Sequence, residues 1–227
     1  MGSAAMNDRE CAAIARELGV LVVSVDYRLG PRNPFPAPLE DCFAAWHFLQ
    51  SNAGSLELDR DRIVVIGQSA GGGLAACLAQ RIADAGDVQP IAQALIYPML
   101  DDRTAANVEL DSLKHRFWNN KNNRAGWQAY LGQPPGQTNT PRFSVAARQT
   151  NLSGLPATWI GVGGLDLFYE ENCAYAARLQ AAGVSCELFR EPGCPHGYDI
   201  IAPKTTVSQR LIQGYMTFIR DHLALQS

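Results

Sequence analysis

Apolar runs of strand length alternate with longer helical stretches along most of the chain. The run at residues 20–25 is almost wholly β-branched or apolar, which is typical of a strand buried on both faces of a parallel sheet. We predict further strands at residues 63–66, 91–96, 157–162 and 185–189. Helices are predicted over residues 8–18, 39–50, 71–84, 169–182 and 206–223. This alternation predicts an α/β fold with a mostly parallel sheet flanked by helices.

Local signals fix several of these boundaries. Asn7 and Glu10 have the spacing of a capping box, which predicts that the first helix begins after Asn7. Gly19 is placed to end that helix as a left-handed C-terminal cap. Residues 27–38 carry four prolines and can continue neither a strand nor a helix, so we predict a crossover loop there.

The alternation breaks between Pro98 and Pro156. We predict one domain over residues 1–227 with an insertion of helices and loops at about 101–155, lying over the carboxyl edge of the sheet. The insertion has scattered aromatic residues, at Phe117, Trp118, Trp127 and Tyr130. These aromatic residues fit two interpretations equally well. The insertion is either a lid that lines a substrate pocket, or an irregular segment whose aromatic side chains simply pack.

Composition is that of an ordinary globular protein and excludes several classes of function. The 227 residues are 47% hydrophobic and 18% charged, and the net charge is −3 with no cluster of Lys or Arg. Nucleic acid is therefore not expected as a partner. No apolar stretch reaches the length of a membrane span, and the first residues lack the features of a signal peptide, so we expect a cytoplasmic protein.

The six cysteines have no pattern that suggests a metal site. They contain no Cys-x-x-Cys pair and no grouping with histidine of the kind that zinc needs. We expect most of them to be buried free thiols, with disulfides as the second choice. No metal and no cofactor is predicted.

The strongest functional signal is the segment Gly67-Gln68-Ser69-Ala70-Gly71. This G-x-S-x-G pattern follows a predicted strand and opens a predicted helix, the context of a nucleophile elbow. Small residues allow the sharp turn that exposes the Ser69 hydroxyl above the sheet. The backbone N–H of Ala70, in the first turn of the helix, could donate to an oxyanion. The alternative is a chance match in an ordinary turn.

A serine hydroxyl needs a base, and His196 is the histidine best placed to act as one. It follows the last predicted strand on a loop rich in Gly and Pro, at the edge of the sheet that presents Ser69. His47 and His222 lie within predicted helices, where packing or the helix dipole explains them. His115 lies in the insertion between basic neighbours and is a weaker candidate.

The base in turn needs a carboxylate to fix its tautomer, and we predict Asp166, which follows the strand at 157–162. Glu170 and Glu171 are competitors that should lie on the next helix, and Asp199 lies too close to His196 along a loop. The order of nucleophile, acid and histidine is that of the α/β-hydrolases.

The chain resembles the hormone-sensitive-lipase-like esterases, the bacterial family IV carboxylesterases of the α/β-hydrolase superfamily, from about Ala12 almost to its end. The resemblance rests on residues 23–29 with the Pro-rich crossover, 67–73, Tyr97-Pro98, 155–171 and 192–198. It implies hydrolysis of short-to-medium acyl esters through an acyl-enzyme. It also implies that Ser69, Asp166 and His196 form the triad, with no metal or organic cofactor.

The start of the chain departs from this family. Such esterases carry a His-Gly-Gly-Gly loop just before the region that aligns with Gly2-Ser3, and amides of that loop complete the oxyanion hole. An N-terminal cap and the first strands also precede this region, including a strand between those predicted here at residues 20–25 and 63–66. Losing one oxyanion donor costs about 10² to 10³ in rate, so reduced activity is expected.

Three hypotheses explain the departure: a truncated esterase, which we prefer, a sheet completed by exchange with a partner chain, or a chain that folds without turning over. The second implies a homo-oligomer, paired at the edge beside residues 20–25. A rival function is a non-catalytic module that binds a small molecule. Peptidase or amidase activity on the same residues is chemically open, although the resemblance favours esters.

Overall fold

The computed structural model describes residues 2–113 and 115–224, and its centre is a sheet of four parallel strands in the order β1-β2-β3-β4. The strand bounds are β1 Val64–Gln68, β2 Ala92–Ile96, β3 Ala157–Gly163 and β4 Cys186–Glu191. The main helices are α1 Asp8–Leu18, α2 Ala37–Ser51, α3 Ala70–Ala85, α6 Tyr169–Ala181 and α8 Thr206–His222. The predicted α/β fold with a parallel sheet is confirmed.

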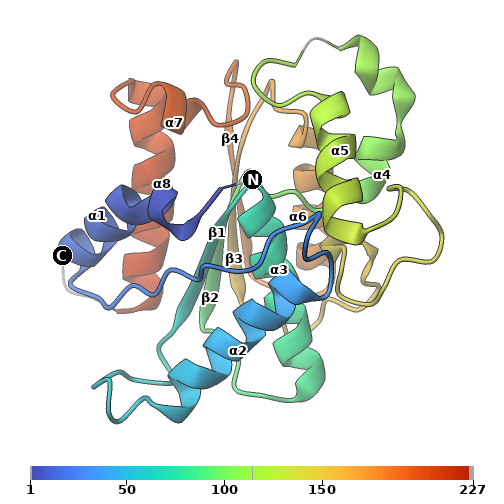
Figure 1. Ribbon diagram of the computed structural model, residues 1–227. Coiled ribbons are helices and arrows are strands. Elements are labelled where there is room, and N and C mark those ends of the chain that lie inside the picture. The colour runs from blue at the N-terminus through green and yellow to red at the C-terminus, as the bar shows by residue number, and fades with distance from the viewer. Residues whose placement is uncertain (1, 114, 225–227) are drawn as a thin grey trace.

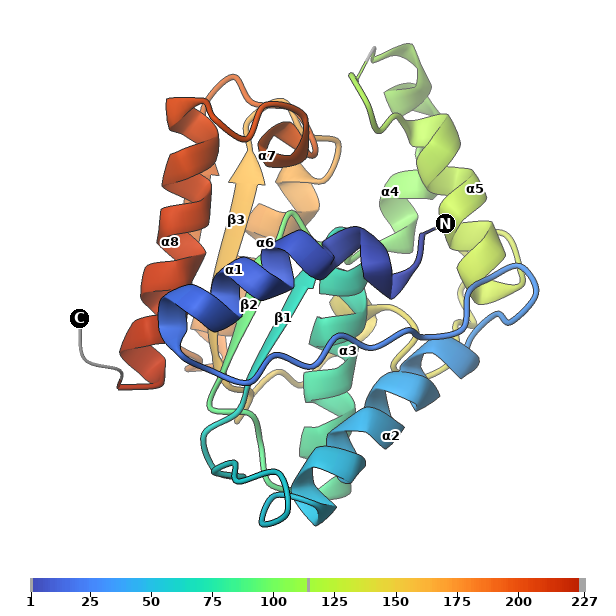
Figure 2. The same cartoon turned by 60° about the vertical axis from the view of Figure 1, so that its left-hand side comes forward.

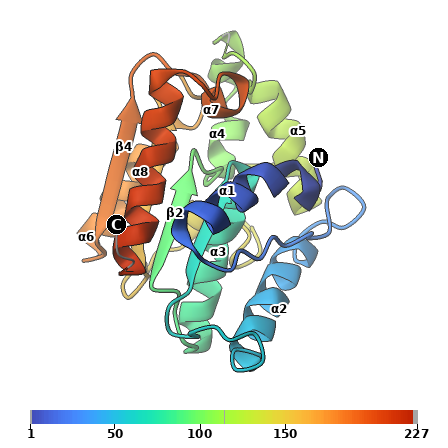
Figure 3. The same cartoon turned by 90° about the vertical axis from the view of Figure 1, so that its left-hand side faces the viewer.

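Helices cover both faces of this sheet. In Figure 1 helices α1 and α8 lie on one side of the strands, and α2, α3 and α6 lie on the other. Each layer encloses its own apolar core: Leu39, Ile82 and Leu179 belong to one, and Ile14 and Phe218 to the other. The strands point their carboxyl ends toward α7 (Tyr198–Ile201), as Figure 3 shows. Parallel strands therefore deliver their following loops to one edge.

Residues 20–25, which we predicted as a central strand, form no strand. In Figure 2 the segment after α1 runs past the β1 side of the sheet on its way to α2. Leu21 and Val23 expose 61% and 46% of their surface, whereas Val20 and Val22 pack against the core. A strand requires a hydrogen-bonded neighbour, and none of the strands in the described residues pairs with this run. A β-branched composition alone was therefore not enough to predict a strand at residues 20–25.

The ends of α1 agree only in part with the sequence. Gly19 is left-handed at φ 65 and ends the helix, as predicted. The predicted capping box is wrong, because Asn7 makes no side-chain bond to the helix backbone. Instead its Nδ2 donates to Glu10 Oε2 at 3.1 Å, and Glu10 Oε1 accepts from the hydroxyl of Tyr215 on α8 at 3.1 Å. These side chains thus join two helices rather than cap one.

Short helices fill the stretch between β2 and β3. They are α4 Asp102–Ala106, η2 Val108–Ser112, α5 Asn120–Leu131 and η3 Ala146–Arg148. The aromatic residues of this stretch differ in burial: Trp127 of α5 is buried in a small core, whereas Phe117, in the loop before α5, exposes 60% of its surface. The carboxylate of Asp102 is fully buried and accepts from Arg148 Nε at 2.6 Å and from the Gly136 amide at 2.6 Å.

All six cysteines are free thiols, although only Cys77 and Cys194 are buried. Within residues 2–113 and 115–224, no helix is both long enough and apolar enough to cross a membrane.

Glu171 fastens the start of this insertion to α6. Its Oε1 accepts from the amides of Leu100 at 2.7 Å and Asp101 at 3.3 Å, and its Oε2 accepts from the hydroxyl of Thr104. Burial raises the pKa of Glu171 from 4.5 to about 8, and these hydrogen bonds oppose the shift. The folded chain therefore holds this proton over a pH range in which the unfolded chain has lost it.

This proton predicts a pH-dependent stability. Between pH 4.5 and about 8 the folded state retains the Glu171 proton, whereas the unfolded state releases it. The free energy of unfolding is therefore highest below pH 4.5 and declines as the pH rises toward 8. The variant E171Q keeps an acceptor for Leu100 and has no charge to bury. Urea unfolding at pH 5, 6, 7 and 8 should show wild type losing up to about 1.4 kcal/mol per pH unit relative to E171Q. The matched control is E170Q, at the exposed neighbour, whose stability should follow the same pH dependence as wild type. If the free energy of unfolding of E171Q changed with pH as that of wild type does, the prediction would be contradicted.

Candidate active site

Ser69 lies on the turn from β1 into α3, in a strained backbone conformation with φ 54 and ψ −119. Its amide donates to the Ile96 carbonyl at 2.9 Å, and its carbonyl accepts from the amides of Gly73 and Met99 at 3.1 and 2.9 Å. These bonds tie both sides of the turn to neighbouring backbone. The side chain is thereby lifted above the carboxyl edge of the sheet.

Glycines leave room for this turn. A Cβ on Gly67 would lie 2.3 Å from the Gly71 carbonyl oxygen, and one on Gly72 would lie 2.8 Å from Cβ of Pro98. Backbone cannot move aside as a flexible side chain can, so these positions require glycine. The approach of α3 to β1 thus explains Gly67, and its approach to the loop after β2 explains Gly72. A Cβ on Gly71, the second glycine of the G-x-S-x-G pattern, would meet only the Tyr27 hydroxyl at 3.8 Å.

The structure brings together the three residues predicted from the sequence. Ser69 Oγ lies 3.0 Å from Nε2 of His196, and Nδ1 of His196 lies 2.8 Å from Oδ2 of Asp166. The other oxygen of Asp166, Oδ1, accepts from the amide of Phe168 at 2.9 Å. Both carboxylate oxygens are therefore held, and the imidazole is oriented between hydroxyl and carboxylate. This is the hydrogen-bond arrangement of a nucleophile, a base and an orienting acid.

Backbone bonds between two loops set the spacing of His196 and Asp166. The amide of Gly164 donates to the Glu191 carbonyl at 2.8 Å, and that of Leu165 donates to the Cys194 carbonyl at 2.9 Å. The loops can approach because Gly163 has no side chain, since a Cβ there would lie 2.2 Å from the carbonyl oxygen of Cys194. The glycine before Asp166 is thus a geometric requirement of the pair.

Three aromatic rings surround the imidazole. The ring centroids of Tyr97, Phe168 and Trp118 lie 4.6, 5.2 and 6.2 Å from that of His196. His196 keeps only 8% of its surface exposed, and Asp166 keeps 4%. Trp118 belongs to the insertion, which therefore reaches the site. The contact of Trp118 with His196 arises from tertiary packing and could not be predicted from the sequence. Water is largely excluded from the histidine, which strengthens its bonds to both partners.

The competing residues occupy other positions. His47 lies 3.6 Å from Asp87, and Nδ1 of His222 lies 2.9 Å from the Phe218 carbonyl of its own helix. Glu171 bonds to the insertion rather than to His196. Asp199, set aside in the sequence as too close to His196 along a loop, is held in α7 by Tyr97 and Gln68. The contact of Tyr97 with the histidine could not be predicted, because the two residues meet only in the folded chain.

Ala70 is the first residue of α3 and is exposed beside Ser69. Backbone N–H groups in the first turn of a helix lack intrahelical acceptors and attract negative charge. Its amide is therefore suitably located to donate to an anion formed at Ser69, and this role stays a prediction. Among residues 2–113 and 115–224, no group of three or more His, Cys, Asp or Glu is placed to hold a metal ion.

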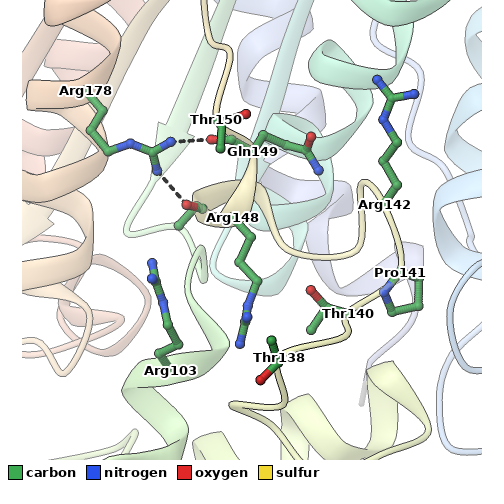
Figure 4. Close-up of a pocket in the computed structure, with 10 residues that line it drawn as sticks. Arg103, Thr138, Thr140, Pro141, Arg142, Arg148, Gln149, Thr150 and Arg178 are labelled. Carbon is green, nitrogen blue, oxygen red and sulfur yellow. Dashed lines mark hydrogen bonds between the residues drawn. The ribbon is translucent and has the colours of Figure 1, made fainter.

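A separate shallow pocket of about 660 Å³ is rich in arginine (Figure 4). Arg178 donates to the carbonyls of Ala147 and Gln149, and Arg148 pairs with Asp102. The other two guanidinium groups, Arg103 and Arg142, pair with Asp101 and Asp84. Because each arginine already pairs with a carboxylate or a carbonyl of this chain, we interpret the cluster as structural rather than as a binding site. It includes neither Ser69, His196 nor Asp166.

The chain belongs to the α/β-hydrolase fold family, whose model matches residues 1–200. This membership agrees with the sheet, the turn at Ser69 and the order of Ser69, Asp166 and His196 along the chain.

Relatives within the family are esterases by name. The chain is 37% identical over 204 residues to carboxylesterase NlhH of Mycobacterium tuberculosis (strain ATCC 25618 / H37Rv), which covers 87% of this chain and 62% of the relative. It is 30% identical over 207 residues to ethyl acetate hydrolase of Pseudomonas putida, with the same coverage of 87% and 62%. The chain thus spans less than two thirds of the length of these curated relatives.

Solved structures agree. A bacterial heroin esterase superposes with a TM-score of 0.93 at 38% identity, covering 100% of this chain and 72% of that one. The esterase LipW from Mycobacterium marinum superposes with a TM-score of 0.88 at 40% identity, covering 98% and 69%.

The spacing of the two loops yields a test. Gly163→Ala would force Cys194 and its loop away from β3, so we expect a loss of about 1–3 kcal/mol in the free energy of unfolding, measured in urea. The matched control is Gly54→Ala, because a Cβ there meets nothing within 4 Å, and it should change stability by less than about 0.5 kcal/mol. Equal stability of the two variants would refute this account of the loop contact.

Proposed function

We propose that this chain is a carboxylic ester hydrolase in which Ser69 is the nucleophile, His196 the general base and Asp166 the orienting acid. The observation that carries the proposal is the continuous set of contacts from Ser69 Oγ to His196 Nε2 at 3.0 Å and from His196 Nδ1 to Asp166 at 2.8 Å. The esterase names of the relatives support the reaction class. Hydrolysis of short-to-medium acyl esters is the substrate class that we propose.

The reaction follows from these contacts. His196 Nε2 takes the hydroxyl proton as Ser69 Oγ bonds to the ester carbonyl carbon, and a tetrahedral oxyanion forms. The imidazolium then gives its proton to the alcohol oxygen as the carbon–oxygen bond breaks, which leaves an acyl-enzyme. Water attacks that ester with His196 again as the base, and the acid and free Ser69 result. Asp166 remains ionised and stabilises the imidazolium at each stage.

The oxyanion needs more than one donor, and Ala70 N–H is the one that we assign. With a single donor, turnover should be slow, because one such hydrogen bond is worth about 10² to 10³ in rate. The upstream part of the relatives is the natural source of further donors. A non-catalytic binding module has less support, because it would not need the bond between Ser69 and His196.

We also propose that the open edge of the sheet pairs with another chain when it is not otherwise covered. β1 is an edge strand whose residues are all partly exposed, and Leu21 and Val23 are exposed beside it. Unpaired strand backbone and adjacent apolar side chains favour association of two copies. Native mass spectrometry at micromolar concentration should show a homo-oligomer, and V23K should shift it toward monomer. A wild-type chain that is monomeric throughout would contradict this proposal.

The central test is hydrolysis of p-nitrophenyl acetate. Ser69→Ala should abolish release of p-nitrophenol above the uncatalysed rate, because no nucleophile remains. Asp166→Asn keeps the shape but can hold the wrong tautomer, so kcat should fall by about 10⁴. The control is Asp61→Asn, at an exposed residue, which should match wild type.

A version of the chain extended upstream separates the rival explanations. Turnover by the 227-residue chain that depends on Ser69 would mean that another group completes the oxyanion hole. Activity confined to the extended version would assign the missing donors to the upstream part. Inactivity of both versions would refute ester hydrolysis and favour the binding module.

A further inference from the structure

A second buried carboxylate, Asp199, interacts with His196 through its charge without a hydrogen bond to it. It is in α7, three residues after His196, and exposes only 7% of its surface. Its Oδ1 accepts from the hydroxyl of Tyr97 at 2.7 Å, and its Oδ2 accepts from Nε2 of Gln68 at 3.1 Å. Gln68 immediately precedes Ser69. One carboxylate therefore joins the ends of β1 and β2 to the segment that carries the histidine.

Tyr97 transmits this anchoring to the imidazole. Its ring meets that of His196 at an interplanar angle of 63°, with the centroids 4.6 Å apart. The residue is almost fully buried, and its backbone has a positive φ of 35, which is unusual for a bulky side chain. Strain of this kind persists only where surrounding bonds impose it. The bond from Tyr97 to Asp199 is such a bond, and it holds the Tyr97 ring in its T-shaped contact with the imidazole.

Asp199 forms no salt bridge with a lysine or arginine among the residues that the structure describes. Facing it are Tyr97, Gln68 and His196, with Glu10 of α1 and Tyr215 of α8 also near enough to interact. Burial raises the pKa of Asp199, and its hydrogen bonds together with the charge of His196 lower it. A buried carboxylate without a fixed cation is costly, and His196 is the cation that can appear beside it.

We propose that Asp199 is a positioning residue, which holds Tyr97 against His196 and Gln68 beside Ser69 and whose negative charge favours the protonated imidazole. The catalytic part of this proposal rests on the proposed esterase function. In the reaction, His196 becomes an imidazolium each time it takes the proton of Ser69 or of water. Asp166 stabilises that cation through Nδ1, and Asp199 stabilises it through space from the Tyr97 side. Two carboxylates therefore act on the histidine, and only Asp166 bonds to it directly.

The test is the titration of the His196 ring, followed by NMR of the full chain and assigned by comparison with His196→Gln. Asp199→Asn keeps an acceptor for Tyr97 and removes the charge. Loss of a nearby negative charge makes the imidazolium less favourable, so the midpoint of the titration should move to lower pH. The acid limb of p-nitrophenyl acetate hydrolysis should move in the same direction. Asp61→Asn, an exposed control, should move neither.

The outcomes separate this proposal from the proposed function. An unchanged midpoint in folded D199N overturns the role of Asp199 even if the chain hydrolyses esters. A lowered midpoint in a chain that hydrolyses no ester supports Asp199, and the proposed function then fails only if the version extended upstream is inactive as well. If D199N fails to fold by circular dichroism, the smaller D199S removes the same charge and is measured instead. Failure of both to fold would mean that Asp199 serves stability, which also overturns the proposal.

Discussion

The site depends on the backbone turn at Ser69, where β1 passes directly into α3. The turn places Ser69 at φ 54, an unfavourable conformation that hydrogen bonds to Ile96, Gly73 and Met99 maintain. It is possible only because glycines let α3 approach the end of β1. The same approach puts the first amides of α3 beside the Ser69 hydroxyl. One local constraint thereby positions both the proposed nucleophile and the proposed oxyanion donor.

The remaining groups reach Ser69 because the sheet is parallel. Asp166 follows β3 and His196 follows β4, so the loops after two neighbouring strands meet at one edge. Backbone bonds between those loops set the distance from carboxylate to imidazole, and Tyr97 after β2 supports the ring. The segment after each strand of the sheet therefore contributes one residue to the site. Asp199 adds a connection among them that does not pass through Asp166.

Much of this could be predicted from sequence, and the failures have physical causes. The five main helices and the four strands were evident because apolar periodicity and turn residues are local signals. The run at residues 20–25 was misassigned because a strand exists only with a partner, which composition does not report. Asn7 and Glu10 had capping spacing, but Tyr215 of a distant helix competes for Glu10. Motif and order along the chain were enough to predict that Ser69, Asp166 and His196 lie together. Tyr97, Trp118 and Asp199 gather around them only through tertiary packing.

The central claim is that the turn, the histidine and the carboxylate make Ser69 a reactive nucleophile. It is tested most directly by treating the chain with a fluorophosphonate and measuring the intact mass, followed by peptide mapping. The account predicts one phosphonyl addition per chain, located on the peptide that contains Ser69 and absent from Ser69→Ala. No addition to the folded chain, or addition that persists at another residue in Ser69→Ala, would contradict it.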